Sequence, residues 1–278
     1  MKPPFGIAQI GKSFRNEITP GNFVFRTREF EQAEMEFFVP PAEEAEWYAH
    51  WKKARMDWYT ELGVNPDKLR MREHDEKELA HYSTATADIE YEYPFGWGEL
   101  EGIACRTDFD LKRHSEASGT DLVYFDPQTK EHYTPYVIEP AGGINRMALT
   151  FLIDAYDEEE LEKDTRTVLR FHPEIAPITA AVFPLVKKDG MPEKAKEIVR
   201  SLRMAHFSTF YDEKAAIGRR YRRQDEVGTP YCITVDGETL DSDVVTVRHR
   251  DSMEQEKVQI ADLVGYLHQT MRDWKRPS

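Results

Sequence analysis

Hydrophobic and polar positions along the N-terminal half follow a strand-like period. Residues 22–39 (NFVFRTREFEQAEMEFFV) place aromatic and charged side chains near a period of two, which predicts one long strand. Residues 43–62 carry tryptophans at near-helical spacing, a pattern typical of an amphipathic surface helix. Residues 82–91 and 98–105 predict further strands. Long strands with peripheral helices indicate an α+β domain.

The C-terminal half alternates short apolar strands with amphipathic helices. A mostly apolar helix at 146–156 precedes an extended segment at 167–173. Strands are then predicted at 178–185, 230–235 and 244–249, and helices at 192–204 and 260–274. Alternation of this kind predicts a compact α/β domain with helices on the faces of a sheet.

An acidic run at residues 157–164 separates the two patterns and is interpreted as a linker. We therefore expect one domain over residues 1–163 and a second over 164–278. The net charge of −14 is uneven, because residues 1–163 hold 18 basic and 33 acidic residues while the rest hold 19 and 18. A nonspecific nucleic-acid binder needs a basic surface, so the acidic balance argues against that class. The asymmetry favours two domains with different partners.

Several classes of protein are disfavoured by composition. Cys105 and Cys232 both lie in apolar strands and are predicted to be buried thiols rather than a disulfide framework. Because no C-x-x-C or H-x-x-x-H pair occurs, we expect no zinc. No run of 18 apolar residues and no secretory signal is present, which predicts a cytoplasmic protein that is not inserted in a membrane.

The first cluster of candidate functional residues is a strand, a Gly/Pro turn and a returning strand. Residues 14–17 (FRNE) are followed by residues 25–30 (FRTREF), and Glu31, Glu34 and Glu36 continue the second strand. Arginines on a sheet suit a polyphosphate, because the planar guanidinium binds phosphate oxygens in pairs. The neighbouring carboxylates suit Mg²⁺ or an ammonium group. A solvated face of cross-strand ion pairs is the alternative reading.

The second cluster runs from a strand into the apolar helix. Residues 137–146 (VIEPAGGINR) bring a glycine pair and Arg146 to a helix start, where backbone amides and a guanidinium can meet an anion. An ordinary strand–helix turn would give the same glycine pair. Glu139 is the more informative residue, because a carboxylate at the end of an apolar run needs a cationic partner.

Together the two clusters resemble motifs 2 and 3 of the class II aminoacyl-tRNA synthetases, in the form found in dimeric glycyl-tRNA synthetases. Residues 181–185 (AVFPL), 218–230 (GRRYRRQDEVGTP) and 250–255 (RDSMEQ) resemble the anticodon-binding domain of the same enzymes. The resemblance covers nearly the whole chain. It implies a class II antiparallel-sheet catalytic domain, truncated at its N-terminus, followed by an α/β anticodon-binding domain.

The resemblance implies a role for each matching residue. Arg15, Glu17 and Arg146 would be catalytic, with Arg15 and Glu17 at the α-phosphate and the adenine amino group and Arg146 at the distal phosphates. The ATP-binding set would be Arg15, Asn16, Glu17, Phe25, Arg26, Thr27, Arg28, Glu29, Phe30, Glu99, Leu100, Gly143, Ile144, Asn145 and Arg146, with Phe30 stacked on adenine and Glu99 a ligand of Mg²⁺. The glycine-binding set would be Phe30, Glu31, Gln32, Ala33, Glu34, Glu139, Pro140, Ala141, Gly142 and Gly143, with Glu34 accepting the ammonium group.

The implied activity is ATP-dependent formation of glycyl-adenylate and transfer of glycine to tRNA(Gly). The arginine cluster Arg219, Arg220, Arg222 and Arg223 is the candidate tRNA contact, with an ion-paired face against Asp225 and Glu226 as the alternative. Ala141 replaces a common Ser, and Asn145 replaces a common acid. The segment with motif 1, which builds the family's homodimer, is expected to be absent. A non-catalytic paralogue, or a fragment that binds ATP or tRNA without full aminoacylation, therefore stays open.

Overall fold

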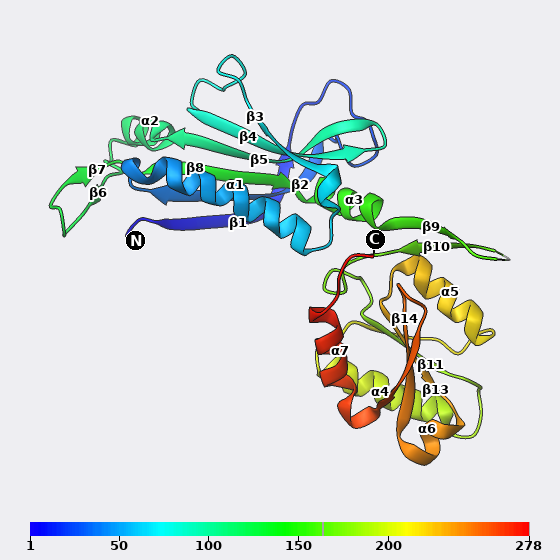
Figure 1. Ribbon diagram of the computed structural model, residues 1–278. Coiled ribbons are helices and arrows are strands. Elements are labelled where there is room, and N and C mark those ends of the chain that lie inside the picture. The colour runs from blue at the N-terminus through cyan, green and yellow to red at the C-terminus, as the bar shows by residue number, and fades with distance from the viewer. Residues whose placement is uncertain (163, 278) are drawn as a thin grey trace. The chain divides into compact units, whose positions relative to one another are not determined.

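The computed structural model describes residues 1–162 and 164–277, which divide into two compact units (Figure 1). The first unit runs from Met1 to Ile153 and the second from Asp154 onward. Lys163, at the domain boundary expected from the sequence, and Ser278, at the end of the second expected domain, lie outside the described residues. Among the described residues, no helix is both long and apolar enough to cross a membrane.

A six-stranded antiparallel sheet forms the first unit, in the order β1-β2-β8-β5-β4-β3. The strands are β1 (Phe5–Phe14), β2 (Glu29–Val39), β3 (Leu69–Glu73), β4 (Ala85–Tyr93), β5 (Gly96–Thr107) and β8 (Tyr136–Gly143). The helices are α1 (Glu44–Glu61), α2 (Phe109–Ser118) and α3 (Ile144–Ala155), and a small hairpin joins β6 (Tyr124–Phe125) to β7 (His132–Tyr133). The helix predicted at 43–62 is thereby confirmed.

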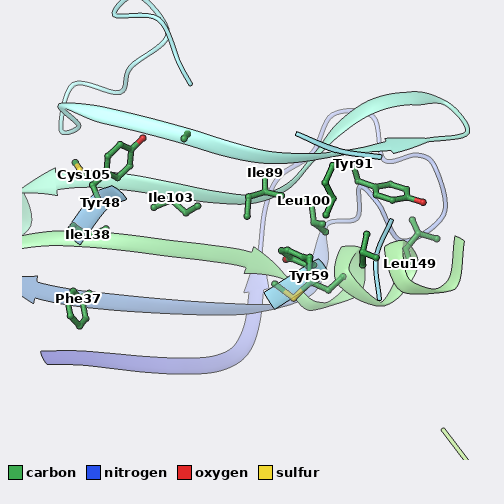
Figure 2. Close-up of a cluster of buried hydrophobic side chains, with 14 of the residues drawn as sticks. Phe37, Tyr48, Tyr59, Ile89, Tyr91, Leu100, Ile103, Cys105, Ile138 and Leu149 are labelled. Carbon is green, nitrogen blue, oxygen red and sulfur yellow. The ribbon is translucent and has the colours of Figure 1, made fainter. Parts of the chain in front are cut away.

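Side chains of this sheet alternate between an apolar face and a polar face, as the pleat of a strand requires. Phe37 of β2, Ile103 of β5 and Ile138 of β8 point to the apolar face, where they are buried with Tyr48 and Tyr59 of α1 (Figure 2). Intervening residues of the same strands point to the opposite face. The core therefore lies under α1 and leaves the other face of the sheet free to form a site.

The second unit is an α/β domain around a mixed five-stranded sheet in the order β12-β11-β13-β14-β15. Its strands are β11 (Ala180–Pro184), β12 (Thr209–Tyr211), β13 (Tyr231–Val235), β14 (Val244–His249) and β15 (Gln255–Gln259). Its helices are α4 (Met191–Met204), α5 (Ile217–Val227), α6 (Gly237–Ser242) and α7 (Leu263–Arg272). The short 3₁₀ helices of the chain are η1 (Pro41–Glu43), η2 (Pro66–Lys68) and η3 (Ile260–Asp262).

Helices cover both faces of this second sheet, as expected for an α/β domain. Val182 packs with Leu202 of α4 and Leu267 of α7 on one face. Phe183 packs with Tyr221 of α5 on the other face. The strands predicted at 178–185, 230–235 and 244–249 are confirmed. Cys105 and Cys232 are buried free thiols, and burial raises the pKa of each to about 12.

Three of the sequence-based expectations about secondary structure are wrong. The strand expected at residues 14–17 ends at Phe14, the last residue of β1. The acidic run is not a linker: β9 (Tyr156–Glu160) pairs with β10 (Thr165–Leu169) as an antiparallel hairpin. Its acids meet arginines of the second strand, with Glu159 2.7 Å from Arg166. The long strand at 22–39 begins only at Glu29, because Asn22 and Phe23 both have a φ of 54° and form a turn instead.

Candidate active site

The polar face of the six-stranded sheet carries a cavity of about 800 Å³. Strands β2, β4, β5 and β8 form its floor, the segment between β1 and β2 closes one end, and α2 closes another. Sixteen residues assigned to substrates from the sequence line it: Arg15, Glu17, Phe25, Arg26, Thr27, Phe30, Gln32, Glu34, Glu99, Leu100, Glu139, Ala141, Gly142, Gly143, Asn145 and Arg146. Positions separated by more than 100 residues in the chain thus meet in one space.

The other seven assigned residues do not line the cavity: Asn16, Arg28, Glu29, Glu31, Ala33, Pro140 and Ile144. Strand alternation explains Ala33 and Pro140, since their neighbours Glu34 and Glu139 point to the cavity and they point away. Glu29 is exposed and forms an ion pair with Lys12 of β1. Direct substrate roles for these residues stay predictions.

The segment from Arg15 to Arg28 is tied together by its own polar groups. The Arg15 amide donates to the Arg28 carbonyl oxygen at 2.9 Å, and Arg28 Nε donates to the Glu17 carbonyl oxygen at 3.0 Å. The Glu17 carboxylate lies 3.7 Å from the Arg26 guanidinium. These contacts hold Arg15 and Glu17 at one end of the cavity without using the Arg15 guanidinium.

Arginine and aromatic side chains pair at this end. The Arg146 guanidinium lies 4.3 Å from the centre of the Phe25 ring, and the Arg15 guanidinium lies 5.2 Å from that of Phe30. Arg146 Nε donates to the Phe25 carbonyl oxygen at 2.8 Å, and Arg146 Nη1 donates to the Glu99 carbonyl oxygen at 2.9 Å. Flat cationic and aromatic surfaces of this kind suit a nucleotide, whose base stacks and whose phosphates pair with guanidinium groups.

Glu99 is held beside this pair by close packing of its neighbour. A Cβ at Gly98 would lie 2.8 Å from the Phe25 ring, so only glycine lets β5 approach this closely. The Glu99 carboxylate is half exposed and lies 3.5 Å from Arg146. Since Mg²⁺ is usually bound through one or two carboxylates together with substrate phosphates, an accessible single carboxylate fits that ion.

The opposite end of the cavity is acidic. Glu34 and Glu36 of β2 and Glu139 of β8 have carboxylate oxygens within 4.8 Å of one another. Glu139 is 3.2 Å from Arg106 Nη1, and burial, opposed by this arginine and reinforced by the two glutamates, raises the pKa of Glu139 to about 8. Burial also raises the pKa of Glu36. Three crowded carboxylates beside one cation make a pocket that favours another cationic group.

Amide side chains hold the acidic strand in place. Asn145 Oδ1 accepts from the Glu31 amide at 2.7 Å, which fixes the start of α3 against β2. Gln32 Nε2 donates to Glu34 at 2.7 Å and so orients that carboxylate. Asn145 therefore has a structural role here, because its side-chain oxygen ties the first turn of α3 to β2; a carboxylate oxygen could accept the same bond.

Gly142 is locked between the cavity and the core. A Cβ there would lie 2.3 Å from Met147 Cε and 3.3 Å from Glu101 Cγ. Glu101 is 2% exposed and cannot move easily, because Arg55 Nε donates to it at 2.6 Å and Tyr59 Oη at 2.6 Å. The glycine therefore fixes the position of β8 at the cavity wall.

Glu36, noted in the first cluster but given no role, also lines the cavity, together with residues that the sequence did not single out: His74, Tyr82, Asp88, Arg106, Asp110 and His114. Asp88 Oδ2 lies 2.7 Å from His74 Nε2, and burial raises the pKa of Asp88. The period of two explains Glu36, which follows Glu34 on the same face of β2. The others come from β4, β5, α2 and the segment between β3 and β4, none of which carries a motif, so only the fold brings them to the site.

The arginine cluster proposed for tRNA lies on α5 and divides in two. Arg220 is 2% exposed, and its Nη1 donates to the Pro184 carbonyl oxygen at 2.7 Å, so its tRNA assignment is inconsistent with the fold. Arg219 and Arg223 are exposed, with Arg223 2.7 Å from Asp212. The alternative ion pairing with Asp225 is also inconsistent with the structure, because Asp225 is fully buried and pairs with arginines of other strands.

Comparison with known proteins shows which proteins this chain resembles. Glycine–tRNA ligase of Alkaliphilus oremlandii (strain OhILAs) is 58% identical over 272 residues, 98% of this chain. That of Staphylococcus haemolyticus (strain JCSC1435) is 59% identical over 268 residues, 96% of the chain. Over nearly its whole length, this chain is homologous to glycine–tRNA ligases. It spans 58% and 57% of the length of these two relatives.

The fold agrees with that relationship. The family model described as "Anticodon binding domain" matches residues 179–270, within the second unit. A crystal structure of prolyl-tRNA synthetase from Cryptosporidium parvum, complexed with L-proline and AMP, superposes with a TM-score of 0.72 at 17% identity over 98% of this chain and 56% of that one. The class II synthetase fold expected from motifs 2 and 3, with its antiparallel sheet and anticodon-binding domain, is confirmed.

Proposed function

We propose that this chain is the catalytic core and anticodon-binding part of a glycine–tRNA ligase acting in the cytoplasm. It would activate glycine with ATP and transfer it to tRNA(Gly). The observation that carries the proposal is a cavity that joins an arginine–aromatic end to an acidic end. The homodimer of the family stays a prediction for this chain.

The arginine–aromatic end would hold ATP. Arg15 would contact the α-phosphate, Arg146 the distal phosphates and Glu17 the adenine amino group, as the family resemblance implies. Phe25 and Phe30 are each covered by an arginine and offer two surfaces for the adenine ring. Glu99 would hold Mg²⁺, which supplies neutralisation of phosphate charge when bound.

The acidic end would hold the amino acid. Glu34 and Glu139 are placed to accept the ammonium group, and the crowding of carboxylates there favours a bound cation. Selection of glycine must come from the walls, because one extra methylene changes binding by only about 1–3 kcal/mol in an open pocket. Ala141 and the immobile Gly142 segment of β8 would form the wall that rejects a side chain.

The chemistry requires positioning more than proton transfer. The glycine carboxylate attacks the α-phosphorus, the bond to the bridging oxygen of pyrophosphate breaks, and glycyl-adenylate remains. Because the nucleophile is already ionised, no general base is needed, and the arginines act by aligning the reactants and stabilising negative charge. The terminal ribose hydroxyl of tRNA then attacks the glycyl carbonyl and releases AMP.

The second unit would recognise the tRNA. Its match to an anticodon-binding family model supports this assignment. Of the four arginines considered, Arg219, Arg222 and Arg223 remain candidates for phosphate contacts, whereas Arg220 serves the fold. Replacing an exposed phosphate-contacting arginine weakens binding across all sequences and lowers its salt dependence.

Glycine-dependent exchange of pyrophosphate into ATP tests the proposal, with alanine and serine as matched amino-acid controls. We expect exchange with glycine and none above background with the other two, followed by charging of tRNA(Gly). Exchange that is independent of the amino acid, or equal for all three, would refute glycine activation. Exchange without charging would restrict this chain to the first half-reaction.

A further inference from the structure

Arg106, at the end of β5, is the one cation within 4 Å of the acidic cluster's carboxylates among the described residues. Its Nη1 lies 3.2 Å from Glu139, while its Nε and Nη2 donate to Asp110 of α2 at 2.6 and 3.1 Å. Its guanidinium also lies 4.3 Å from the centre of the Tyr82 ring. Three different partners therefore fix the orientation of this side chain.

The bidentate bond to Asp110 directs Arg106 towards Glu139. When one carboxylate accepts from both Nε and Nη2 of a planar guanidinium, the direction of the remaining Nη1 group is fixed. Asp110 accepts both bonds, and its pKa is lowered mainly by that hydrogen bonding. Asp110 therefore remains charged and keeps the arginine oriented towards the cavity, which a flexible lysine would not do.

Glu36 has the opposite effect to Arg106 on the protonation of Glu139. The carboxylate oxygens of Glu36 and Glu139 lie within 4.8 Å of each other and of Glu34, so Glu36 and Glu34 both add negative charge beside Glu139. Arg106 favours the carboxylate form of Glu139, whereas Glu36 favours its protonated form. The charge of Glu139 is thus set by a balance between one neighbour on β5 and one on β2.

We propose that Arg106 is a positioning residue of the amino-acid pocket, which holds Glu139 in place as a carboxylate so that it can accept the ligand's ammonium group. A proton held by Glu139 in the unliganded pocket would leave to solvent as the ammonium group binds. This inference rests on the proposed function for the identity of the ligand. The charge-setting role of Arg106 itself rests on the geometry of the unliganded pocket.

The groups that face Glu139 are few. β2 contributes Glu34 and Glu36, β5 contributes Arg106, and α2 contributes Asp110, with His114 of the same helix also lining the cavity. Asp110 is neutralised by Arg106 and His114 acts on Asp110 rather than on Glu139. A substitution of Arg106 or Glu36 therefore changes the field at Glu139 directly.

The first test measures Glu139 itself in the unliganded chain. Carbon-13 NMR of labelled glutamate would follow the titration of Glu139 in the wild type, Arg106→Gln and Glu36→Gln, with Glu139→Gln used to assign the signal. An opposite charge within 4–6 Å shifts a carboxyl pKa by about 1–3. We expect the pKa of Glu139 to rise by about 1 or more in Arg106→Gln and to fall in Glu36→Gln. Unchanged titration in both folded variants would overturn the proposal.

The second test links this charge to the ligand. At about pH 7, Arg106→Gln should raise the KM for glycine about tenfold or more, because each pKa unit reduces the ionised fraction tenfold, and leave the KM for ATP unchanged. The pH at which glycine binds well should move upward in Arg106→Gln and downward in Glu36→Gln. Arg106→Lys should restore the pH profile in part. The control Lys112→Gln removes an exposed cation of α2 that pairs with Asp108, and it should change neither the KM for glycine nor its pH profile.

The two tests separate the inference from the proposed function. In one outcome, the pKa of Glu139 shifts in opposite directions in Arg106→Gln and Glu36→Gln, but the wild type shows no glycine-dependent exchange. This would support the role of Arg106 and refute glycine as the ligand. In the other outcome, the wild type shows glycine-dependent exchange, Arg106→Gln loses kcat equally at every pH, and the pKa of Glu139 does not shift. This would overturn the inference and leave the proposed function standing. If Arg106→Gln melts early, Glu36→Gln still decides the result, since its shift has the opposite sign.

Discussion

The variant Arg15→Ala tests whether Arg15 binds substrate or supports the fold. The Arg15 side chain is exposed, and among the described residues its guanidinium makes a cation–π contact with Phe30 and no ion pair. An exposed contact of this kind contributes about 0.5–1 kcal/mol. The backbone bond from Arg15 to Arg28 does not depend on the side chain. The variant should therefore fold and melt almost as the wild type does.

The cost to catalysis should be much larger than the cost to folding. Loss of one donor that stabilises charge in a transition state lowers the rate by about 10²–10³, or roughly 3–4 kcal/mol. We therefore expect kcat/KM for glycine-dependent pyrophosphate exchange to fall by about 10²–10³ in Arg15→Ala. Exchange kinetics and a thermal melt of the same preparations would measure the two effects.

Lys12→Ala is the matched control for Arg15→Ala. Lys12 is an exposed cation on the same strand that pairs with Glu29 and lies outside the cavity. Its removal should leave exchange unchanged. Our reasoning would be refuted if Arg15→Ala retained exchange, or if exchange and melting temperature fell together while Lys12→Ala behaved normally.

Three further predictions follow from burial and charge. Asp225→Asn should lower the free energy of unfolding of the second unit by about 3–5 kcal/mol in urea, because it leaves two buried arginines without a full counter-charge. The control Asp243→Asn, at an exposed ion pair, should lower it by at most about 1 kcal/mol. Equal losses in the two variants would contradict this reasoning. Gly142→Ala should destabilise the first unit by at most about 1 kcal/mol in the same assay, because Met147 Cε is the end of a flexible side chain that can turn away and the remaining contact with Glu101 Cγ is 3.3 Å; a loss of several kcal/mol would show that Met147 cannot move. The KM for glycine should fall as pH rises towards about 8, because the carboxylate of Glu139 accepts the ammonium only when ionised, and a flat profile would count against that role.

The fold was predictable where the buried side chains of an element are apolar. β11 and β13 are fully buried strands of largely apolar residues, β14 is half buried, and each lies where the pattern places it. Helix α5 was missed for a physical reason: its buried positions are Arg220, Gln224 and Asp225, so its inner face reads as polar. β1 was missed because most of its residues are exposed and show no alternation.

The site was predictable where a motif supplies the residues. Arg15, Glu34, Glu139 and Arg146 were candidates from the sequence, and all four line one cavity. Arg106 was not, since it acts through contacts with Asp110 and Glu139 that only the antiparallel register of β5 and β8 creates. Motifs therefore identify the residues of a site, and the fold identifies the neighbours that set their charge.

A crystal structure of this chain with a non-hydrolysable glycyl-adenylate analogue tests the central claim most directly. We predict that the analogue occupies the cavity on the polar face of the six-stranded sheet. Its ammonium group should lie within hydrogen-bonding distance of Glu34 and Glu139, and its phosphate mimic should contact Arg15. An analogue bound with its ammonium group away from both glutamates, or bound outside this cavity, would contradict the account.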